Sequence, residues 1–552
     1  MAKYSIGIDY GTLSARALLL NIQTGEEVCV SEMAYPHGVM DECLPSGKRL
    51  GDSWALQDPQ DYLDALQVTI GELLQKSGVS PEDIVGIGVD FTSCTILPTL
   101  ADGTPLCKTE GFEDTPHAYV KLWKHHAAQY CADELNAKAE AMGEKWLALY
   151  GGKISSEWMI PKIMQILKEE PRVYNACDQI LEAGDWVVWQ LVGHQARSAC
   201  NAGFKGIYRH DTGYPSKAFF RALDPRLENV VEDKLSTDIR PIDSCAGYLT
   251  KAMADWTGLK EGTPVAVEIM DSIASVPACQ IDGPGKMLMI MGTSTCHEVL
   301  SAEERGVPGT CGIVKDGALP GSFCYEAGQS CVGDHFSWFV NRCLPSDYKE
   351  EAEQRGISPH VLLTEKASRL KPGESGLLAL DWWNGVRSVL MDFDLSGLIL
   401  GMTLRTKPEE IYRALIEATA FGTRQIIDAF ETAGAPIHEL YAAGGIASKN
   451  AMAMQIYADI CNKPIKISGS DQSGALGSAI LGIAAADPAL TGYKNVNEAA
   501  RKLGKIKDTV YHPMAGNVAI YAQLFAEYKK LHDYFGRGEN NVMKKLRALR
   551  RQ

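Results

Sequence analysis

The N-terminal part of the chain alternates between apolar segments and short turns. Residues 4–9, 15–20 and 28–30 each have the composition of a strand, and turns containing Gly and Thr separate them as in an antiparallel meander. Apolar residues at three- and four-residue intervals predict a helix over 59–77, and a further apolar run predicts a strand over 84–90. This succession of strands and helices indicates an α/β domain.

A comparable beginning recurs in the middle of the chain. The apolar segment 286–291 is followed by the turn 292–295 and by a second strand-like segment, 296–300. The Gly- and Pro-rich stretch 280–285 just before it has the composition of a domain boundary. We therefore expect two related α/β domains, each with a Gly-Thr turn, and a ligand cleft between them. The predicted domains are 1–282 and 286–552.

Long helices are predicted in the second half of the chain. Residues 408–433 form an amphipathic pattern, and the strand-like segment 438–443 enters a Gly-Gly pair. Apolar periodicity predicts further helices over 450–460 and 518–535.

Composition is typical of a folded protein and argues against a general nucleic-acid binder. Of the 552 residues, 45% are hydrophobic and 22% are charged, as in ordinary folded chains of about two to four domains. The formal net charge is −15, whereas binding to nucleic acid normally needs a basic surface. The basic segment 544–551 is expected to be a solvated helix rather than an attachment to RNA or membrane.

Nothing in the sequence predicts export or a membrane span. The N-terminus lacks the basic and apolar regions of a secretory signal, and the longest apolar runs, such as 480–486, are far shorter than the roughly 20 residues that cross a bilayer. The fifteen cysteines are scattered without a Cys-x-x-Cys pair, which favours reduced thiols. We expect a cytoplasmic protein with no membrane or nucleic-acid partner, and a homodimer is compatible with the sequence.

The first turn combines residue types that suit phosphate and magnesium. Asp9 ends a predicted strand and can hold Mg²⁺ directly or through its water shell, while Arg16 can neutralise phosphate charge. Gly11 lets backbone N–H groups approach phosphate oxygens, and Thr12 can donate a further hydrogen bond. A plain hairpin with an aspartate beside its turn would have the same sequence.

Two later glycine clusters favour a nucleotide site. Gly292 and Thr293 repeat the Gly-Thr turn, so the two turns could hold a triphosphate between them. Gly444 and Gly445 lie between a strand and a helix, where small residues let a base or ribose approach the backbone. Neither a Gly-x-x-x-x-Gly-Lys-Ser/Thr loop nor a strand-linked Gly-x-Gly-x-x-Gly pattern is present in the sequence, and its histidines form no recognisable metal-ligand pattern.

A further carboxylate, Asp271, follows the apolar run 265–270 just before the expected boundary. There it would face the cleft and could accept the proton of an attacking hydroxyl, which is the usual duty of a base in phosphoryl transfer. The alternative is that Asp271 caps a helix beginning near Ser272.

Taken in this order, the residues resemble the FGGY family of carbohydrate kinases, ATPases with the actin-like (ribonuclease H-like) fold, over roughly residues 4–535. The resemblance implies two actin-like α/β domains with an interdomain cleft. It further implies that the turn 9–12 and the turn at Gly292 and Thr293 contact ATP phosphates, and that Asp271 is the catalytic base. The other nucleotide contacts that it implies are Gly333, Ser337, Gly444, Gly445 and Lys449. One departure concerns the last of these, because Ser448 and Lys449 stand where many members have Arg-Ser.

Within the family, three segments are similar to those of the members that phosphorylate L-ribulose, namely 88–98, 122–126 and 381–385. The resemblance further implies sugar contacts from Ser93, Lys205, Asp271 and Glu326, since polar groups of this kind suit a polyhydroxylated ligand. Taken singly, Ser93 would be an ordinary loop hydroxyl, and Lys205 and Glu326 would be surface charges.

The activity implied by the resemblance is transfer of the γ-phosphate of ATP to the 5-hydroxyl of L-ribulose, with Mg²⁺ bridging the phosphates. A family member acting on D-ribulose, ribitol or xylulose is the first alternative, and a panel of sugars would distinguish these substrates. An ATP-binding sensor that has lost turnover is the second alternative. The presence of Asp271 argues against the sensor.

Overall fold

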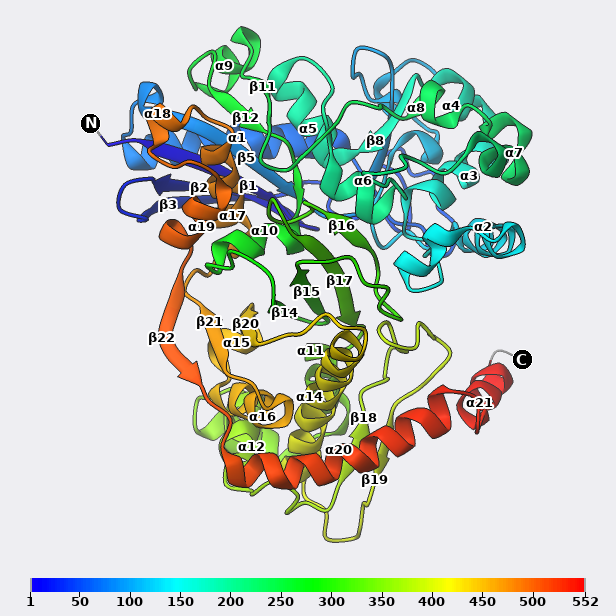
Figure 1. The fold of residues 1–552 in the computed structure, drawn as a ribbon, viewed down its shortest axis with the longest axis vertical. Helices are drawn as coiled ribbons and strands as arrows, with labels where there is room; N and C mark the ends of the chain where they lie inside the picture. The colour runs from blue at the N-terminus through cyan, green and yellow to red at the C-terminus, as the bar shows by residue number, and fades with distance from the viewer. Residues whose placement is uncertain (1, 551–552) are drawn as a thin grey trace. The chain divides into compact units, whose positions relative to one another are not determined.

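The computed structural model describes residues 2–550; Met1, Arg551 and Gln552, which fall at the ends of the predicted domains and of the basic segment, lie outside the described residues. Contacts divide the chain into two compact α/β units (Figure 1). The first unit comprises Met1–Gly283, Gly312–Cys324 and Gln472–Lys505, and the second comprises Pro284–Cys311, Tyr325–Asp471 and Ile506–Gln552. The assignment of the sugar to one predicted domain and of the nucleotide to the other stays a prediction.

The first unit is built on a sheet with the strand order β11-β12-β5-β1-β2-β3. β1 (Tyr4–Tyr10), β2 (Ser14–Asn21) and β3 (Glu27–Ala34) form the predicted antiparallel meander. β5 (Ile84–Phe91) runs parallel to β1, so the carboxyl ends of these two strands lie at the same edge of the sheet.

One face of this sheet is apolar and is covered by α1 (Pro59–Ser77), whose bounds match the prediction. Tyr10 of β1 and Phe91 of β5 both pack against Tyr62 of α1, with ring centroids 6.0 Å and 4.9 Å apart. These aromatic contacts fix the ends of the two strands against the helix.

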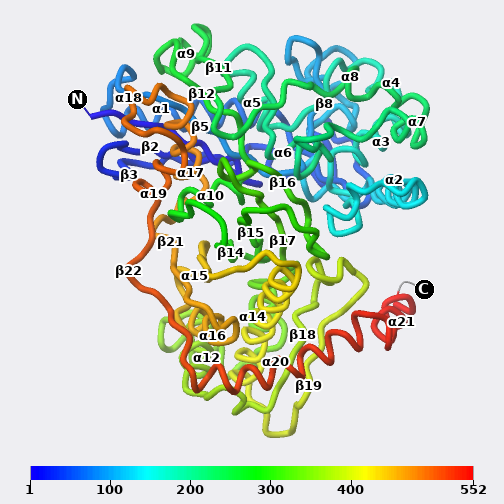
Figure 2. Tube along the Cα trace, viewed as in Figure 1, coloured from blue at the N-terminus to red at the C-terminus, as the bar shows by residue number. Residues whose placement is uncertain are grey.

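The opposite face carries small residues and is covered by α17 (Ser473–Ala484). A Cβ atom on Gly7 or Gly88 would lie 1.8 Å from a backbone oxygen of α17, so glycine is required for this close approach. Figure 2 shows the orange segment that contains α17 lying beside the blue strands of the same unit, although the segment is late in the chain. Side chains two residues apart on a strand point to the same face, so Asp9 and Asp90, each two residues after one of these glycines, lie on this face.

The apolar run 265–270 contributes to two short strands, β12 (Pro264–Ala266) and β13 (Ile269–Met270), and both pair with β5. β13 leads directly into α10 (Asp271–Ala278), which packs against α17. The hydroxyls of Ser275 and Ser473 lie 3.0 Å apart at this contact. Asp271 is therefore the first residue of a helix at the same edge of the sheet.

The remaining helices and strands of the first unit surround this core and include a four-stranded sheet with the order β4-β7-β6-β8. They are β4 (Leu56–Gln57), β6 (Ile96–Thr99), β7 (Val120–Lys121), α2 (Gln129–Met142), α3 (Met159–Glu169), α4 (Pro171–Ala176), β8 (Gln179–Glu182), α5 (Ala183–Val192), β9 (Arg197–Ser198), α6 (Ala199–Lys205), α7 (Lys217–Leu223), α8 (Val230–Lys234), β10 (Ile239–Arg240), β11 (Cys245–Tyr248), α9 (Lys251–Thr257), β16 (Ile313–Lys315), α18 (Pro488–Thr491) and α19 (Val496–Leu503).

The second unit has a sheet in which β14 (Lys286–Met291) pairs with the antiparallel β15 (Thr295–Ser301) and the parallel β20 (Glu439–Ala443). The long predicted helix is α14 (Pro408–Thr432), which packs against α16 (Ala451–Cys461). The strands and helices that complete this unit are β17 (Phe323–Gln329), α11 (Gly333–Trp338), α12 (Ser346–Gln354), α13 (Pro359–Ala367), β18 (Leu378–Leu380), β19 (Leu398–Leu400), α15 (Gly445–Lys449), β21 (Ile465–Ser468), β22 (Ile506–Tyr511), α20 (Ala515–Gly536) and α21 (Val542–Arg550).

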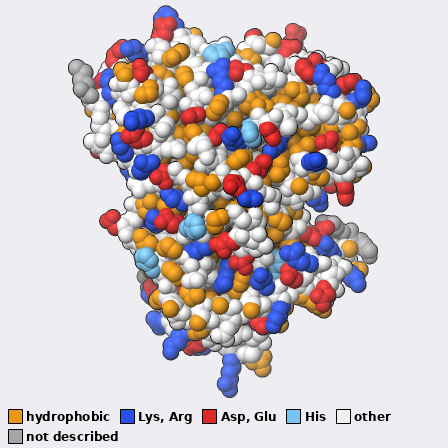
Figure 3. All heavy atoms as spheres, viewed as in Figure 1, with side chains coloured by type: hydrophobic (Ala, Val, Ile, Leu, Met, Phe, Trp, Pro, Cys, Tyr) orange, Lys and Arg blue, Asp and Glu red, His pale blue; other side chains and the backbone are white. Residues whose placement is uncertain are grey.

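The distribution of surface charge and the length of the apolar helices can be compared with the expected partners. On the face shown in Figure 3, acidic and basic side chains are interspersed over each unit. Within residues 2–550, no single helix has the length and apolar composition of a membrane span; α17 and the segment Pro488–Leu503 meet these criteria only as a pair bent by 119°.

Candidate active site

Two carboxylates lie opposite each other at the carboxyl ends of β1 and β5. Asp9 and Asp90 are register partners on these strands. Both lie beside the start of α17, where a Cβ on Gly474 would be 3.1 Å from Asp9 Oδ2 and 3.4 Å from Asp90 Oδ1. Asp90 Oδ2 accepts a hydrogen bond of 2.6 Å from Ser478 Oγ, whereas the buried Asp90 Oδ1 has no hydrogen-bond donor among the described residues.

Burial raises the pKa of both carboxyl groups. For Asp9, the hydrogen bond with Asp90 and the charge of Arg16 offset part of the effect of burial, and Arg16 Nη1 lies 3.6 Å from Asp9 Oδ2. For Asp90, the charge of Asp9 adds to burial, and the pKa is raised well above its usual range. Asp90 is buried and the Asp9 side chain is 16% exposed, and two carboxyl groups so placed are costly to ionise unless a cation joins them.

The donor set fits Mg²⁺, which prefers oxygen ligands and is usually held by one or two carboxylates together with water and substrate phosphates. Asp9 and Asp90 supply such oxygens from register-paired positions at the ends of β1 and β5. Among residues 2–550, no three His, Cys, Asp or Glu side chains are grouped so as to hold a metal ion by themselves.

The predicted phosphate turn follows Asp9 and is tied to its surroundings. Gly11 N–H donates to the carbonyl of Ser14 at 3.0 Å, which closes the turn between β1 and β2. Thr12 Oγ1 accepts a hydrogen bond of 3.1 Å from the indole Nε1 of Trp123, so a member of the segment 122–126 orients the hydroxyl. The Thr12 hydroxyl retains its own hydrogen for donation to a ligand.

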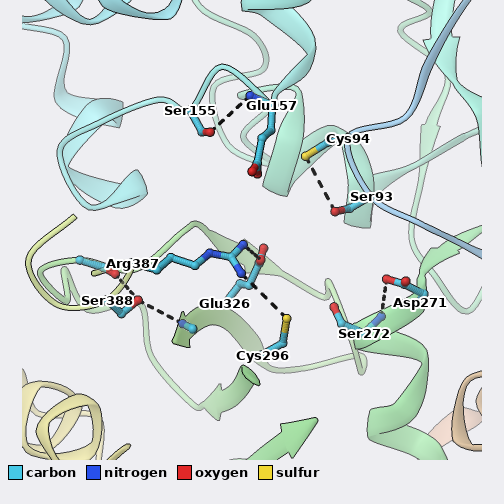
Figure 4. Close-up of polar contacts among 12 residues, drawn as sticks. Ser93, Cys94, Ser155, Glu157, Asp271, Ser272, Cys296, Glu326, Arg387 and Ser388 are labelled. Carbon is cyan, nitrogen blue, oxygen red and sulfur yellow. Dashed lines mark hydrogen bonds and ion pairs between the residues drawn. The ribbon is translucent and has the colours of Figure 1, made fainter. Parts of the chain in front are cut away.

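Asp271 lies next to these carboxylates along the sheet. β13 pairs with β5 in the register that places Ile269 opposite Asp90, and the charge of Asp271 contributes to the raised pKa of Asp90. Asp271 Oδ1 accepts a hydrogen bond of 2.7 Å from the backbone N–H of Ser272 (Figure 4). A helix cap would instead accept from the N–H of a residue two or three positions on, and Met270, not Asp271, occupies the N-cap position of α10. The Asp271 side chain is partly exposed.

Lys205 is buried, so the interpretation of this residue as a surface lysine is wrong. It is the last residue of α6 and is 1% exposed, with Nζ 5.4 Å from the ring centroid of Trp158. The ammonium group is thus within cation–π range of an aromatic ring, and a buried charged donor of this kind suits a binding role.

Ser93 lies in the loop that connects β5 to β6 and is partly exposed, whereas the other residues of the loop, Thr92, Cys94 and Thr95, are buried. Lys162 Nζ donates to the carbonyls of Cys94 and Leu122 at 2.5 Å and 2.8 Å. Lys162 therefore fastens the segment 88–98 to the segment 122–126, and burial lowers its pKa to about 8.

In the second unit, the predicted nucleotide glycines gather at the ends of two parallel strands. Gly292 and Thr293 form the turn after β14, and the N–H of Gly333 donates to the carbonyl of Gly292 at 3.0 Å. Gly444 follows β20 with φ of 92°, and a Cβ there would lie 2.5 Å from the carbonyl oxygen of Met291. Only glycine fits this conformation and this approach without strain.

The remaining predicted nucleotide residues lie on short helices that begin at these glycines. Ser337 is on α11, which starts at Gly333, and Lys449 is on α15, which starts at Gly445. Ser337, Gly445 and Lys449 are exposed. Their nucleotide contacts stay predictions.

Glu326 is buried on β17, so its interpretation as a surface carboxylate is wrong. The side chain is 3% exposed, and its Oε1 accepts a hydrogen bond of 2.8 Å from Nη2 of Arg387 (Figure 4). Arg387 lies shortly after the segment 381–385, which resembled the members that act on L-ribulose.

The sequence analysis did not identify three of these residues, namely Asp90 and Lys162 in the first unit and Arg387 in the second. A sequence signal for Asp90 does exist, because β1 and β5 each end with two small residues and an aspartate at alternate positions. No comparable local pattern marks Lys162 or Arg387, whose partners are distant in the chain.

The chain matches two family models. Residues 4–276 match the N-terminal domain of the FGGY family of carbohydrate kinases, and residues 287–486 match its C-terminal domain. Among curated relatives, a protein named Ribulokinase from Bacillus licheniformis is 56% identical over 98% of this chain and 98% of its own length. A Ribulokinase from Anoxybacillus flavithermus is 55% identical over 99% of this chain and 97% of its own length.

Solved structures show the same fold at lower sequence identity. The xylulose kinase from Rhodospirillum rubrum has a TM-score of 0.79 at 21% identity and covers 96% of this chain and 98% of its own. The glycerol kinase of Plasmodium falciparum, solved with ADP, has a TM-score of 0.76 at 18% identity and covers 96% of this chain and 98% of its own. These values confirm the expected two-domain α/β, actin-like fold.

Proposed function

The chain belongs to the FGGY family of carbohydrate kinases, and we propose that it transfers the γ-phosphate of ATP to the 5-hydroxyl of L-ribulose, giving L-ribulose 5-phosphate and ADP. The observation that carries this choice of sugar is the match, over nearly the whole chain, to proteins named Ribulokinase. The burial of Lys205 and Glu326 supports a sugar as the substrate, since buried charged groups suit the recognition of a polyhydroxylated ligand.

In this proposal Asp271 takes the proton of the attacking sugar hydroxyl. Its carboxylate is partly exposed at the first residue of α10, and the N–H of Ser272 orients it through Oδ1. A base within hydrogen-bond reach of a hydroxyl accelerates its attack. The reaction moves the hydroxyl proton to the carboxylate as the new O–P bond forms and the bond to the ADP oxygen breaks.

The groups that stabilise the transferred phosphoryl group are backbone and hydroxyl donors. Thr12, with the N–H groups of its turn, and Thr293, with those of the second turn, would donate to oxygens on which negative charge develops. Gly444 and Gly445 would lie against the adenosine part of ATP, where a side chain would be an obstacle. Gly333, Ser337 and Lys449 would complete the nucleotide contacts.

Asp9 would hold Mg²⁺, with Asp90 beside it, and the ion would neutralise charge on the ATP phosphates. The charge of Arg16, which lies 3.6 Å from Asp9 and 3.1 Å from Glu32, would limit the repulsion among the acidic groups of this turn.

The sugar contacts proposed for this chain are Ser93, Lys205, Asp271 and Glu326. Lys205 would donate to sugar hydroxyls, Glu326 would accept from them, and Ser93 can do either. We further propose that the protein is cytoplasmic, that it acts without nucleic-acid or membrane partners, and that it forms a homodimer.

A panel of sugars with coupled detection of ADP tests the proposal. L-Ribulose is expected to give the highest kcat/KM among L-ribulose, D-ribulose, D-xylulose and ribitol, and phosphorus NMR should place the phosphate on the 5-oxygen. A higher kcat/KM with another pentulose or with ribitol would mean that the protein is a kinase for that compound and not for L-ribulose. If none of the four compounds gives sugar-dependent release of ADP, the alternative of an ATP-binding sensor is favoured.

A further inference from the structure

The segment that follows β18 contains an arginine to which the proposed function gives no role. Arg387 Nη2 donates to Glu326 Oε1 at 2.8 Å, and the two side chains are 24% and 3% exposed. In Figure 4 the Arg387 side chain extends toward the Glu326 carboxylate. The arginine is thus the partly exposed member of a pair whose acidic member is buried.

The backbone beside Arg387 is fixed to the strand that carries Glu326. Ser388 N–H donates to the carbonyl of Gly328 at 3.0 Å, and Gly328 N–H donates to Ser388 Oγ at 3.1 Å. Ser388 Oγ also donates to the carbonyl of Gly309 at 2.6 Å. These bonds hold Arg387 at a constant distance from Glu326, because Gly328 and Glu326 are two residues apart on β17.

Gly328 also provides the space that the arginine occupies. Residues two apart on a strand point to the same face, so Gly328 and Glu326 share a face of β17. A Cβ on Gly328 would lie 3.0 Å from Arg387 Nη1 and 3.1 Å from its Cδ. The side chain of Arg387 therefore crosses β17 over the position where Gly328 has none.

The other edge of the guanidinium reaches the neighbouring strand. Arg387 Nη1 lies 3.9 Å from Sγ of Cys296, and β15, which carries Cys296, is next to β17 in the sheet. A planar guanidinium held at several points has little rotamer freedom left to lose when its partner binds a ligand.

We propose that Arg387 is a positioning residue for the sugar, which holds the Glu326 carboxylate in the orientation that accepts a hydrogen bond from a sugar hydroxyl. This inference rests on the proposed sugar contact of Glu326. A carboxylate accepts several hydrogen bonds, so the bond from Arg387 is compatible with others from a ligand. The arginine acts through Glu326 and touches no reacting atom.

A second Arg–Glu pair in the same unit shows what a purely structural pair looks like. Arg413 Nε donates to Glu417 Oε1 at the same distance, 2.8 Å, but both side chains are buried, 6% and 3% exposed, and both belong to α14. Arg413 also donates to the carbonyls of Ala367 and Leu370 and to Tyr521. It is a matched control because its loss should affect stability alone.

The test compares Arg387→Met, Arg387→Lys, Gly328→Ala and Arg413→Met by KM for sugar, KM for ATP, kcat and Tm. Arg387→Met should raise the sugar KM by about 10- to 100-fold, since a charged hydrogen bond is lost, and should change the ATP KM by less than about twofold. Arg387→Lys should raise the sugar KM by less than Arg387→Met does, because lysine keeps the positive charge but lacks the planar guanidinium with its several N–H donors. Gly328→Ala, which keeps both charges but displaces the guanidinium, should raise the sugar KM by a smaller factor.

A double-mutant cycle decides whether the arginine acts through Glu326. In a Glu326→Ala background, Arg387→Met should change the sugar KM by less than about threefold. Arg413→Met should lower Tm and leave the sugar KM unchanged.

Three results would overturn the inference. One is an unchanged sugar KM in Arg387→Met, with a fall in Tm like that of Arg413→Met. Another is a full effect of Arg387→Met in the Glu326→Ala background. The third is the absence of turnover by the unsubstituted protein with every sugar of the panel. If the unsubstituted protein turns over a sugar other than L-ribulose, only the proposed substrate is wrong, and the same variants are then compared with that sugar.

Discussion

Asp9 and Asp90 occupy paired positions at the ends of two parallel strands, and Gly474 at the start of α17 is placed against both carboxylates. Both carboxylates lie on the glycine-containing face of β1 and β5, on which α17 packs close to the strand backbones. Burial makes these carboxyl groups costly to ionise, and this cost is the physical reason to expect a cation beside them.

Asp9→Asn should reduce turnover without reducing stability. Asparagine keeps the shape but lacks the charge that would hold Mg²⁺, so kcat should fall by about 10²-fold or more and the Mg²⁺ concentration for half-maximal activity should rise. Because the pKa of Asp9 is raised in the folded protein, its ionised form costs stability above that pKa, and the variant should have an equal or higher Tm at pH 7.

The control for Asp9 is Asp255→Asn, since the Asp255 side chain on α9 is 68% exposed. This control should leave kcat and the Mg²⁺ dependence unchanged. If Asp9→Asn keeps more than about a tenth of the original kcat with an unchanged Mg²⁺ dependence, Asp9 has no part in metal binding.

Lys205→Met should weaken the use of sugar far more than the use of ATP. Methionine keeps most of the volume of the buried side chain, while loss of a charged hydrogen bond should lower kcat/KM for the sugar by about 5- to 150-fold. Steady-state kinetics with each substrate varied in turn gives the two KM values. Lys217→Ala on the exposed start of α7 is the control. A larger effect on the ATP KM than on the sugar KM would assign Lys205 to the nucleotide.

Gly333→Ala should disturb the nucleotide turn of the second unit. The new Cβ would lie 2.6 Å from the carbonyl oxygen of Gly292, so the turn must shift. Strain of about 1–3 kcal/mol is usual for such overpacking, and the ATP KM should rise by about fivefold or more. The sugar Kd, measured by calorimetry, should stay the same.

A matched glycine tests whether the Gly333 effect is local. Gly516 is on α20, and a Cβ there would meet no atom within 4 Å. Gly516→Ala should therefore leave the kinetics unchanged and should not lower Tm. If Gly333→Ala also leaves the ATP KM unchanged, the turn at Gly292 does not contact the nucleotide.

Glu182→Gln should change how stability depends on pH. Glu182 is 1% exposed, and neither of its carboxylate oxygens has a hydrogen-bond partner in the described part of the chain. Burial raises its pKa to about 8. Because the pKa of Glu182 is higher in the folded than in the unfolded protein, its neutral carboxyl does not reduce the free energy of unfolding below the usual pKa near 4.5. As the pH rises from there toward 8, the protein loses stability. Each pKa unit corresponds to about 1.4 kcal/mol, so the Gln variant should gain several degrees of Tm over the original protein between pH 5 and pH 8.

The control for this pH dependence is Glu140→Gln, at an exposed position of α2. Its Tm should follow that of the original protein at every pH. If the Tm difference between Glu182→Gln and the original protein is constant from pH 5 to pH 8, the Glu182 carboxyl is not held neutral by burial.

Local patterns were enough to predict much of the fold. The strands of the meander, α1, β14 and α14 lie within a few residues of their predicted bounds, because apolar periodicity reports burial directly. The strand-end position of Asp9 and the start of α10 at Asp271 follow from the same patterns.

Contacts that are distant in the chain could not be predicted in this way. α17 packs on β1 and β5 although it lies more than 380 residues beyond them, as the bond between Ser478 and Asp90 shows. The division of the apolar run 265–270 into two short strands is likewise set by pairing with β5. Lys162 and Arg387 gain their roles only from such tertiary contacts, so no local signal marked them.

The central claim, that Asp271 is the base in the transfer of phosphate to the sugar, is tested most directly by kcat of Asp271→Asn. General-base catalysis contributes about 10²–10⁴-fold, so kcat with L-ribulose should fall by that factor while the sugar Kd and Tm change little. If Asp271 only stabilises the start of α10 through the bond from Ser272 N–H, kcat should stay nearly unchanged, because the side-chain oxygen of asparagine accepts the same bond. A kcat above about a tenth of the original value would contradict the claim and remove Asp271 from the mechanism.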